Sequence, residues 1–493
     1  MLPPHADPRA ACVEALARLR AGEIAPMAAW LRGHLFEHIL PFWERHAFDP
    51  QGGLCTCVDD AGTILSRDKW LWSQWRAVWV FSRVHRVHEP DRRWLDRAGG
   101  IVAFCRRHGW DPRGNGWALV LAQDGRMVRG HESIYTDAFA VTGLTEFFRA
   151  SGDGEALALA EETARAALAK LAAPVATIPH FPYPIPAGAK PHGLPMIWSL
   201  VLAEFAEFAA RPSYAGAAAA MAAEIFRDFH RQDCDLVLEF VGADGGALPP
   251  PHGTVVVPGH AIEDMWFQIH VARHLHLGSA RVAEACRLIL RHLEIGWDHA
   301  GGGGVLLAVD SGGRQPVAWN FAESKLWWPQ TEALYAALLG WAQTGRSEFL
   351  DWYERLWRVC LDHFVDWSHG EWRQKLNRDF RPIAETIALP VKDPFHLPRS
   401  LMLQIELLTR MSHTWFANDR RCHLPHEATS GIRPQRQVSR HVAILGKANE
   451  PSAAQGRNPP PAGKPSSGGQ ALLRRASRRT WPVHRRAGRV EGK

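Results

Sequence analysis

The connections between the predicted helices alternate between short and long, and this alternation constrains the fold more than any other feature. Apolar residues at helical spacing predict twelve helices, roughly 25–39, 67–88, 91–107, 133–150, 153–171, 192–210, 214–230, 259–276, 280–295, 323–343, 347–363 and 398–411. Tight turns such as 89–91, 151–153 and 344–346 alternate with long connections at 40–66, 108–132, 172–191, 231–257, 296–322 and 364–397. A helix pair therefore recurs every 60 to 70 residues or so, which is typical of helical arrays.

Three long connections share a pattern typical of short hairpins, an aspartate with a glycine cluster followed by an alternating apolar run. They are FDPQGGLCTCVDDAG (48–62), WDPRGNGWALVLAQDGR (110–126) and WDHAGGGGVLLAVDSGG (297–313). Six helix pairs can close into a ring, so we predict an all-α fold, an (α/α)6 barrel with short β-hairpins in the long loops at one end. Because loops carry function, we expect the site at that end, where the even-numbered helices begin.

The charge of the chain is divided between two parts. The net charge is +6, but residues 411–493 hold 16 Lys/Arg and 4 Asp/Glu, which leaves residues 1–410 with 41 basic and 47 acidic residues. An acidic body argues against nucleic acid as a partner. We predict a barrel domain over residues 1–412 and a basic tail over 413–493, which lacks any helical or strand period and should be disordered. A basic binding arm and translation out of frame are the alternatives for the tail.

The start of the chain lacks the pattern of a secretory signal, and the sequence lacks a membrane-spanning segment. No run of 18 apolar residues occurs, and the first twenty residues lack a charged segment followed by an apolar stretch. The eight cysteines lack the CxxC spacing of a zinc site or disulfide framework. We therefore expect a cytoplasmic protein that does not bind membranes.

The stretch VPGHAIEDMW (257–266) places candidate chemistry at the start of the eighth helix. A Pro-Gly break puts His260 at the helix terminus and Glu263 one turn on, on the same face. One interpretation makes Glu263 and Asp264 first-turn acids that match the helix dipole, with His260 an incidental cap. In the other, the terminus favours neutral imidazole, the form that acts as a base, while a neighbouring carboxylate orients the ring and raises its pKa.

A second histidine occupies the equivalent position of the twelfth helix, where His396 precedes Pro398. In a closed ring both helix starts open into one bowl, so we expect the two imidazoles to face one another there. Arg76 in the second helix could stabilise a developing oxyanion, or form a salt bridge with an acid at the rim.

Aromatic and polar residues near the predicted rim are candidates for binding a ligand. The chain has 22 Trp, and flat indole faces suit the apolar faces of sugar rings, although a Trp stripe at helical spacing is more often core. The substrate-binding candidates are Trp72, Lys325, Trp328, Gln330 and Glu332. His270 and His274 have metal-ligand spacing without an HExxH motif, so we expect no metal.

Four motifs resemble those of the N-acylglucosamine 2-epimerase family, which includes related mannose isomerases and cellobiose 2-epimerases. They are PGHAIE (258–263), KLWWPQTEA (325–333), EWRQKLNRD (371–379) and FHLPRSL (395–401), and the likeness extends from about residue 25 to 410. The resemblance implies an (α/α)6 barrel that interconverts sugars at C2 without a metal or redox cofactor. It also implies that His260 and His396 form the acid/base pair and that Arg76 and Glu263 hold the ring-opened sugar and the histidine. Trp372 and Arg399, in the last two motifs, join the substrate-binding candidates.

The chemistry that the resemblance implies agrees with the residues found. Epimerisation at C2 requires ring opening, loss of the proton beside the aldehyde and its return on the opposite face, so two bases on opposite walls are needed. Members that act on cellobiose or mannose resemble one another in a further histidine of the sixth helix, where this chain offers Ser199 or Leu200. That difference favours N-acylhexosamines as the substrate. Arg373 and Gln374, however, differ from the residues that family members acting on N-acylhexosamines tend to carry there.

Several alternatives stay open from sequence. An aldose–ketose isomerase shares the enediolate, and a cellobiose 2-epimerase shares the fold. A glycoside hydrolase would need two carboxylates across the cleft, for which Glu263, Asp264 and Glu332 are available. A non-catalytic sugar-binding or protein-interaction role is a further alternative. We expect a small-molecule sugar as the partner, allow for a homodimer, and expect a nucleotide to act as an effector if it binds at all.

Overall fold

Fourteen α-helices make up most of the described chain, which in this computed structural model comprises residues 7–209 and 211–422, with side chains described up to residue 412. They are α1 Pro8–Arg20, α2 Ile24–Gly33, α3 Leu40–His46, α4 Leu71–Arg83, α5 Arg92–His108, α6 Ile134–Ser151, α7 Gly154–Leu171, α8 Gly193–Phe205, α9 Pro212–Glu224, α10 Pro258–His274, α11 Ser279–Gly296, α12 Trp327–Thr344, α13 Ser347–Val359 and α14 His396–Cys422. π-Helical segments (η1 His34–Ile39, η2 Val84–His88, η4 Ile225–Phe229, η6 Cys360–Phe364) and 3-10 turns (η3 Val175–Thr177, η5 His252–Thr254) extend or join them.

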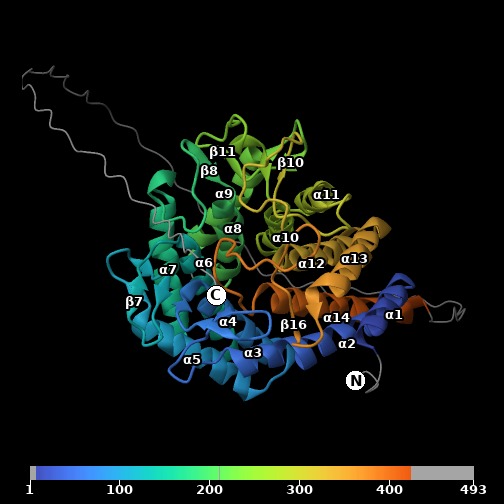
Figure 1. Cartoon of the computed structure of the whole chain (residues 1–493), viewed down its shortest axis with the longest axis horizontal. Coiled ribbons are helices and arrows are strands. Elements are labelled where there is room, and N and C mark those ends of the chain that lie inside the picture. Colours follow the sequence, from blue (N-terminus) through green and yellow to red (C-terminus); the bar gives the residue numbers. More distant parts are fainter. Residues whose placement is uncertain (1–6, 210, 423–493) are drawn as a thin grey trace, which may run out of the picture. The chain divides into compact units, whose positions relative to one another are not determined.

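The helices form two concentric layers, as the loop lengths predict (Figure 1). The inner layer is α4, α6, α8, α10, α12 and α14, each packed against the next, and each of α5, α7, α9, α11 and α13 packs against the inner helix before it. α2 covers α14, and an ion pair between Arg83 and Glu406 (2.5 Å) joins α4 to α14 across the closing gap. The (α/α)6 barrel prediction is therefore confirmed.

The long connections all lie at one end, and short antiparallel strands organise them. The strands are β1 Cys57–Val58, β2 Ile64–Ser66, β3 Lys69–Trp70, β4 Trp110–Asp111, β5 Gly116–Trp117, β6 Val120–Leu121, β7 Met127–Arg129, β8 Ala189–Pro191, β9 His230–Arg231, β10 Leu236–Val237, β11 Phe240–Gly242, β12 Val255–Val256, β13 Val309–Asp310, β14 Lys325–Leu326, β15 Val365–Asp366, β16 Glu371–Trp372 and β17 Lys375–Leu376. The predicted hairpins are present as β4–β5 and as single bridges at Phe48–Leu54 and Trp297–Val305. The pairs β3–β6, β8–β11, β12–β13 and β14–β17, together with the bridge between Ser133 and His180, connect each long loop to the next one along the chain.

The inner helices are buried around most of their circumference because neighbours cover every side. α12 is buried without interruption from Trp327 to Gly340, and α4 from Leu71 to Ser82. A helix that is enclosed in this way is normally apolar all round. Polar side chains on these helices, such as Arg76, therefore need partners inside the protein, and most of them find these at the long-loop end.

Two helices were not predicted, α1 and α3, and α3 lies in the expected long connection 40–66. The expected tail is mostly outside the described residues. α1 begins at Pro8 after an Asp7 cap and buries Cys12, Leu16 and Leu19 against the barrel, a spacing that the sequence does contain. α14 runs on to Cys422, beyond the predicted boundary at 412, and residues 423–493 lie outside the described part. In residues 7–209 and 211–422, no helix has both the length and the apolar character required to cross a membrane.

Gly143 shows how closely the inner helices approach one another. A Cβ atom at this position of α6 would lie 2.5 Å from the Trp75 carbonyl oxygen of α4, which is backbone and cannot turn aside. We expect Gly143→Ala to lower the free energy of unfolding by about 1–3 kcal/mol. Thermal unfolding should show this, with Gly100→Ala as the control, since a Cβ at that α5 position meets open space. The control should be neutral or stabilising by up to about 1 kcal/mol, and equal midpoints would contradict the close-approach argument.

Candidate active site

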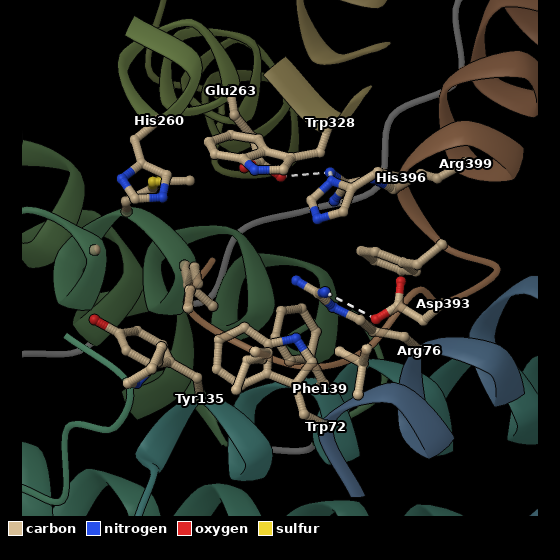
Figure 2. Close-up of a pocket in the computed structure, with 18 of the residues that line it drawn as sticks. Trp72, Arg76, Tyr135, Phe139, His260, Glu263, Trp328, Asp393, His396 and Arg399 are labelled. Carbon is tan, nitrogen blue, oxygen red and sulfur yellow. Dashed lines mark hydrogen bonds and ion pairs between the residues drawn. The ribbon is translucent and has the colours of Figure 1, made fainter. Parts of the chain in front are cut away.

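A cavity opens among the first turns of the inner helices, at the end that holds the long loops. Its empty volume is about 1290 Å³ including the open mouth. The residues that line it and that the sequence singled out are Trp72, Arg76, His260, Glu263, Trp328, His396 and Arg399. Figure 2 shows His260 and His396 on either side of Trp328, with Trp72, Arg76 and Phe139 across the cavity from them. The predicted bowl is therefore present, with both imidazoles at its wall.

His260 takes its orientation from a carboxylate that the sequence did not nominate. Its Nδ1 lies 3.1 Å from Oε2 of Glu239, which stands between β10 and β11. Burial opposes a charged ring here, but the charge of Glu239 and its hydrogen bond prevail, so the pKa of His260 is raised. The expectation that Glu263 orients His260 is therefore corrected, because Glu263 is bound by Arg399 instead. This environment favours the imidazolium form of His260, which can donate a proton.

His396 has the opposite electrostatic setting. Its Nδ1 lies 2.8 Å from Oε1 of Glu332 on α12, so the neutral ring carries its proton on Nδ1 and keeps Nε2 as the basic nitrogen. Burial lowers the pKa of His396 well below its ordinary value, and the charge of Arg76 adds to this effect. Arg399, bound to Glu332 at 2.8 Å, offsets the attraction of that carboxylate for a charged ring. His396 is poised as a neutral base.

Trp328 separates the two histidines. Its ring lies 5.1 Å from that of His260 at an interplanar angle of 28°, and 5.7 Å from that of His396 at 39°. A Cβ on Gly259 would lie 2.7 Å from the indole, so the glycine of the PGH motif leaves the space that Trp328 fills. The Pro-Gly break at the start of α10 therefore has a packing role in addition to ending the preceding strand.

Arg76 combines the two roles that the sequence left open. Its Nη1 lies 3.2 Å from Oδ2 of Asp393, and its guanidinium lies 4.0 Å from the centre of the Phe139 ring and 4.9 Å from that of Trp72. Ser73 donates a hydrogen bond to the same Asp393 oxygen at 3.0 Å. The arginine is thus held by an acid from the loop before α14, and it still lines the cavity, where it can approach a negatively charged oxygen.

Four predicted substrate-binding residues do not line the cavity, and three of them contact other parts of the protein behind it. Lys325 binds Asp298 at 3.0 Å and the Gly301 carbonyl at 2.8 Å, Gln330 binds the Val305 amide and carbonyl at 2.8 and 2.9 Å, and Trp372 donates to His34 at 3.0 Å. All three are completely buried. We correct these assignments, because their polar atoms hold hairpins and helices together behind the site. Glu332 is also set back from the cavity, and it contacts His396 directly.

An internal repeat explains why KLWWPQ (325–330) resembles a functional motif. KWLWSQ (69–74) has the same spacing, and its lysine binds Asp49 at 2.7 Å while its glutamine binds the Leu54 amide and carbonyl at 2.7 and 3.0 Å. In each copy the lysine therefore binds the aspartate of the preceding hairpin, and the glutamine binds the backbone on the other side of that hairpin. The spacing serves loop geometry at two places in the ring.

Several cavity residues were not predicted as site residues. Glu239, Asp393, Tyr135, His180 and Tyr183 all line the cavity. Glu239 falls in the LEFV strand segment and Asp393 three residues before His396, so proximity to the two histidine motifs was the available signal. Tyr135 and His180 lie in segments without a distinctive pattern, and only the folded chain brings them to the site.

Two groups of three described residues have ligand atoms within 4.8 Å of one another, the spacing that a metal ion needs. One is Glu263, Glu332 and His396, but Arg399 binds both of its carboxylates. The other is Glu204, His270 and His274, near the short-loop end of α8 and α10. Burial and then the charge of Arg273 lower the pKa of His270 to about 3. Both groups therefore lie beside guanidinium groups, which oppose binding of a divalent cation.

Comparison with known proteins identifies relatives along most of the chain. The model of one family, described as N-acylglucosamine 2-epimerase (GlcNAc 2-epimerase), matches residues 53–399. The N-acylglucosamine 2-epimerase of Bos taurus is 29% identical over 383 residues, which cover 76% of this chain and 90% of that protein. The cellobiose 2-epimerase from Bacillus thermoamylovorans has a TM-score of 0.68 at 19% identity, covering 77% of this chain and 98% of that chain. A D-mannose isomerase has a TM-score of 0.65 at 19% identity, covering 78% and 97%. At such identities the two structural matches establish the fold.

Proposed function

The chain belongs to the N-acylglucosamine 2-epimerase family, and on that premise we propose that it interconverts N-acyl-D-glucosamine and N-acyl-D-mannosamine, or closely related aldoses. Family membership makes it an isomerase that acts on sugars. The observation that carries the more specific proposal is the pair of imidazoles in one cavity, each with Nδ1 on a different carboxylate and with pKa values displaced in opposite directions.

The environments of His396 and His260 suit removal of a proton from C2 of the sugar and return of a proton to the opposite face of that carbon. In one direction, Nε2 of neutral His396 takes the proton beside the aldehyde of the ring-opened sugar, and protonated His260 delivers a proton to the other face. The histidines exchange roles in the reverse direction. The enediolate between these steps carries negative charge on oxygen, and Arg76 lies at the cavity wall to stabilise it.

The proposed reaction requires neither a metal nor a redox cofactor, because the carbon skeleton keeps its oxidation state and only a proton moves. In this mechanism Glu239, Glu332, Arg399 and Asp393 are positioning residues, since each acts through His260, His396 or Arg76. A nucleotide effector and a homodimer stay predictions. We also propose a cytoplasmic location, which the seven free cysteines of the described residues support.

The pH dependence of the rate should reflect the two displaced pKa values. In the direction where His396 removes the proton, the rate needs neutral His396 and protonated His260. The lowered pKa of His396 places the acidic limb below about 6.5, and the raised pKa of His260 places the alkaline limb above about 6.5. Glu239→Gln removes the charge that raises the pKa of His260, so the alkaline limb should move to lower pH. Profiles of kcat/KM for the wild type, Glu239→Gln and the exposed control Glu323→Gln would measure this, and an unchanged alkaline limb in Glu239→Gln would contradict the pairing.

Proton NMR of sugars incubated with the protein in D2O tests the proposal directly. N-Acetylglucosamine, N-acetylmannosamine, mannose, glucose and cellobiose would be compared. Deuterium at C2 together with inversion is the expected result for the N-acyl sugars, and inversion of cellobiose alone would redirect the proposal to that disaccharide. Intact C2–H in every sugar would overturn the epimerase proposal.

An aldose–ketose isomerase is the second candidate, since it uses the same enediolate and returns the proton to C1. A D-mannose isomerase shares the fold, and a ketose product in the same NMR experiment would identify this activity. A glycoside hydrolase fits less well. Glu263 and Glu332 both bind Arg399 on one side of the cavity, and Asp264 is buried against His192 at 2.7 Å.

A further inference from the structure

The cavity holds a second pair of hydrogen-bonded titratable groups that the chemistry at C2 does not use. The Tyr135 hydroxyl on α6 lies 2.5 Å from Nε2 of His180, which belongs to the long connection between α7 and α8. Both residues line the same cavity as His260 and His396. In Figure 2, Tyr135 lies on the same side of the view as His260, away from Asp393.

The partners of His180 determine how this pair is protonated. Its Nδ1 lies 2.9 Å from the backbone carbonyl oxygen of Tyr183, which can only accept a hydrogen bond, so Nδ1 carries a proton. Burial lowers the pKa of His180, so the ring is neutral and its Nε2 must accept the proton of the Tyr135 hydroxyl. Burial likewise raises the pKa of Tyr135, which keeps the phenol neutral. The Tyr135 oxygen therefore retains lone pairs that can accept a proton from a ligand.

The pair lies close to the groups proposed to act at C2. The ring of Tyr183, which holds His180 through its carbonyl, is 6.2 Å from that of His260, and the ring of Trp72 is 5.7 Å from that of Tyr135. The charge of Glu239, which binds His260, also favours the protonated form of His180. A proton taken up by His180 would therefore be stabilised by a carboxylate that the site already contains.

The proposed reaction includes a step that neither His260 nor His396 performs in the scheme above. An aldose in solution is almost entirely cyclic, and the proton at C2 becomes acidic only when C1 is an aldehyde. We propose that Tyr135 and His180 catalyse opening and closure of the pyranose ring, and that the protein therefore has a second activity, the interconversion of sugar anomers. This inference rests on the proposed function for the class of substrate.

Ring opening requires one proton to leave O1 and one to reach O5, and Tyr135 and His180 can carry out both transfers. The hydroxyl proton on O1 passes to the Tyr135 oxygen while the phenolic proton of Tyr135 passes to Nε2 of His180. The C1–O5 bond breaks, its electron pair stays on O5, and C1=O forms. The pair then returns one proton to O5 by the reverse transfers, which one group can do because O1 and O5 are both bonded to C1. Closure on the opposite face of the aldehyde produces the other anomer.

Exchange between the anomers can be measured separately from the chemistry at C2. Magnetisation-transfer NMR on the H1 signals of N-acetylglucosamine, with the full chain present, gives the anomer exchange rate, and deuterium incorporation gives the C2 rate. We expect the wild type to accelerate anomer exchange and Tyr135→Phe to lower the catalysed rate by about 100-fold or more. His180→Asn is the second variant, in case one of the two does not fold. His396→Ala should lose the C2 rate and keep anomer exchange, and Tyr214→Phe on the outer helix α9 is the matched control.

Each outcome bears on one proposal. Anomer exchange in Tyr135→Phe and His180→Asn that equals the wild-type rate, while the wild type still inverts C2, would overturn the role of the pair and leave the epimerase proposal intact. Loss of anomer exchange in His396→Ala would also overturn it, because the two activities would then share one base. A wild type that accelerates anomer exchange without any change at C2 would overturn the epimerase proposal and support the pair.

Discussion

Replacing His396 with alanine is expected to lower the rate of C2 epimerisation by about 100- to 10,000-fold, the usual contribution of a general acid or base. His396 is only 7% exposed, and its Nδ1 is held by Glu332 at 2.8 Å, so the ring is fixed in place with Nε2 as its basic nitrogen, and alanine has no group that can replace it. Steady-state rates in both directions, with unfolding midpoints to verify the fold, would measure the effect.

A two-base mechanism also predicts which part of the activity survives. A protein with one histidine left can still remove the C2 proton from the epimer that this histidine faces, but it cannot complete the inversion. His260→Ala and His396→Ala should therefore each incorporate deuterium at C2 of one epimer only, and of opposite epimers. His252→Ala, an exposed histidine in η5, is the control and should behave as the wild type. Incorporation into the same epimer by both variants would contradict the assignment of one histidine to each face.

Replacing Arg399 with methionine is expected to lower the free energy of unfolding by about 3–5 kcal/mol, the typical cost of breaking a buried ion pair from one side. The Arg399 guanidinium binds Glu332 at 2.8 Å and also Glu263, and all three residues are buried. Its removal leaves two buried carboxylates close together without the ion pairs that Arg399 makes to both. Thermal and denaturant unfolding of the purified variant would measure the loss.

Neutralising the two carboxylates separates the effect of their charge on stability from the effect of lost packing around Arg399. Adding Glu263→Gln and Glu332→Gln to Arg399→Met removes the uncompensated charges, so a large part of the lost stability should return. Arg346→Met is the matched control, because Arg346 pairs with Glu348 at the surface, where both side chains are about half exposed. Such a pair contributes at most about 1 kcal/mol. Equal losses in Arg399→Met and Arg346→Met would contradict the role of burial.

A local sequence pattern does not show whether a residue belongs to the site, as the Lys/Gln repeat and the Tyr135–His180 pair illustrate. KLWWPQ has a conspicuous pattern and lies beside the site, yet its lysine and glutamine hold a hairpin, as those of KWLWSQ do. Tyr135 and His180 have no pattern at all and lie in the cavity, 45 positions apart in the chain. A motif near a site can thus serve the loop that forms the site.

The sequence by itself determined the architecture and the two histidines. Helical spacing, turn residues and loop lengths act over a few residues, so they indicated twelve of the helices, the end that holds the site, and the helix starts that carry His260 and His396. Only the tertiary structure decided the partners: Glu239 rather than Glu263 for His260, Arg399 for Glu263, and Asp393 for Arg76. The physical reason is that a hydrogen bond or ion pair depends on distances of a few ångströms, and the segments that supply its two partners can lie hundreds of residues apart, as Arg76 and Asp393 do.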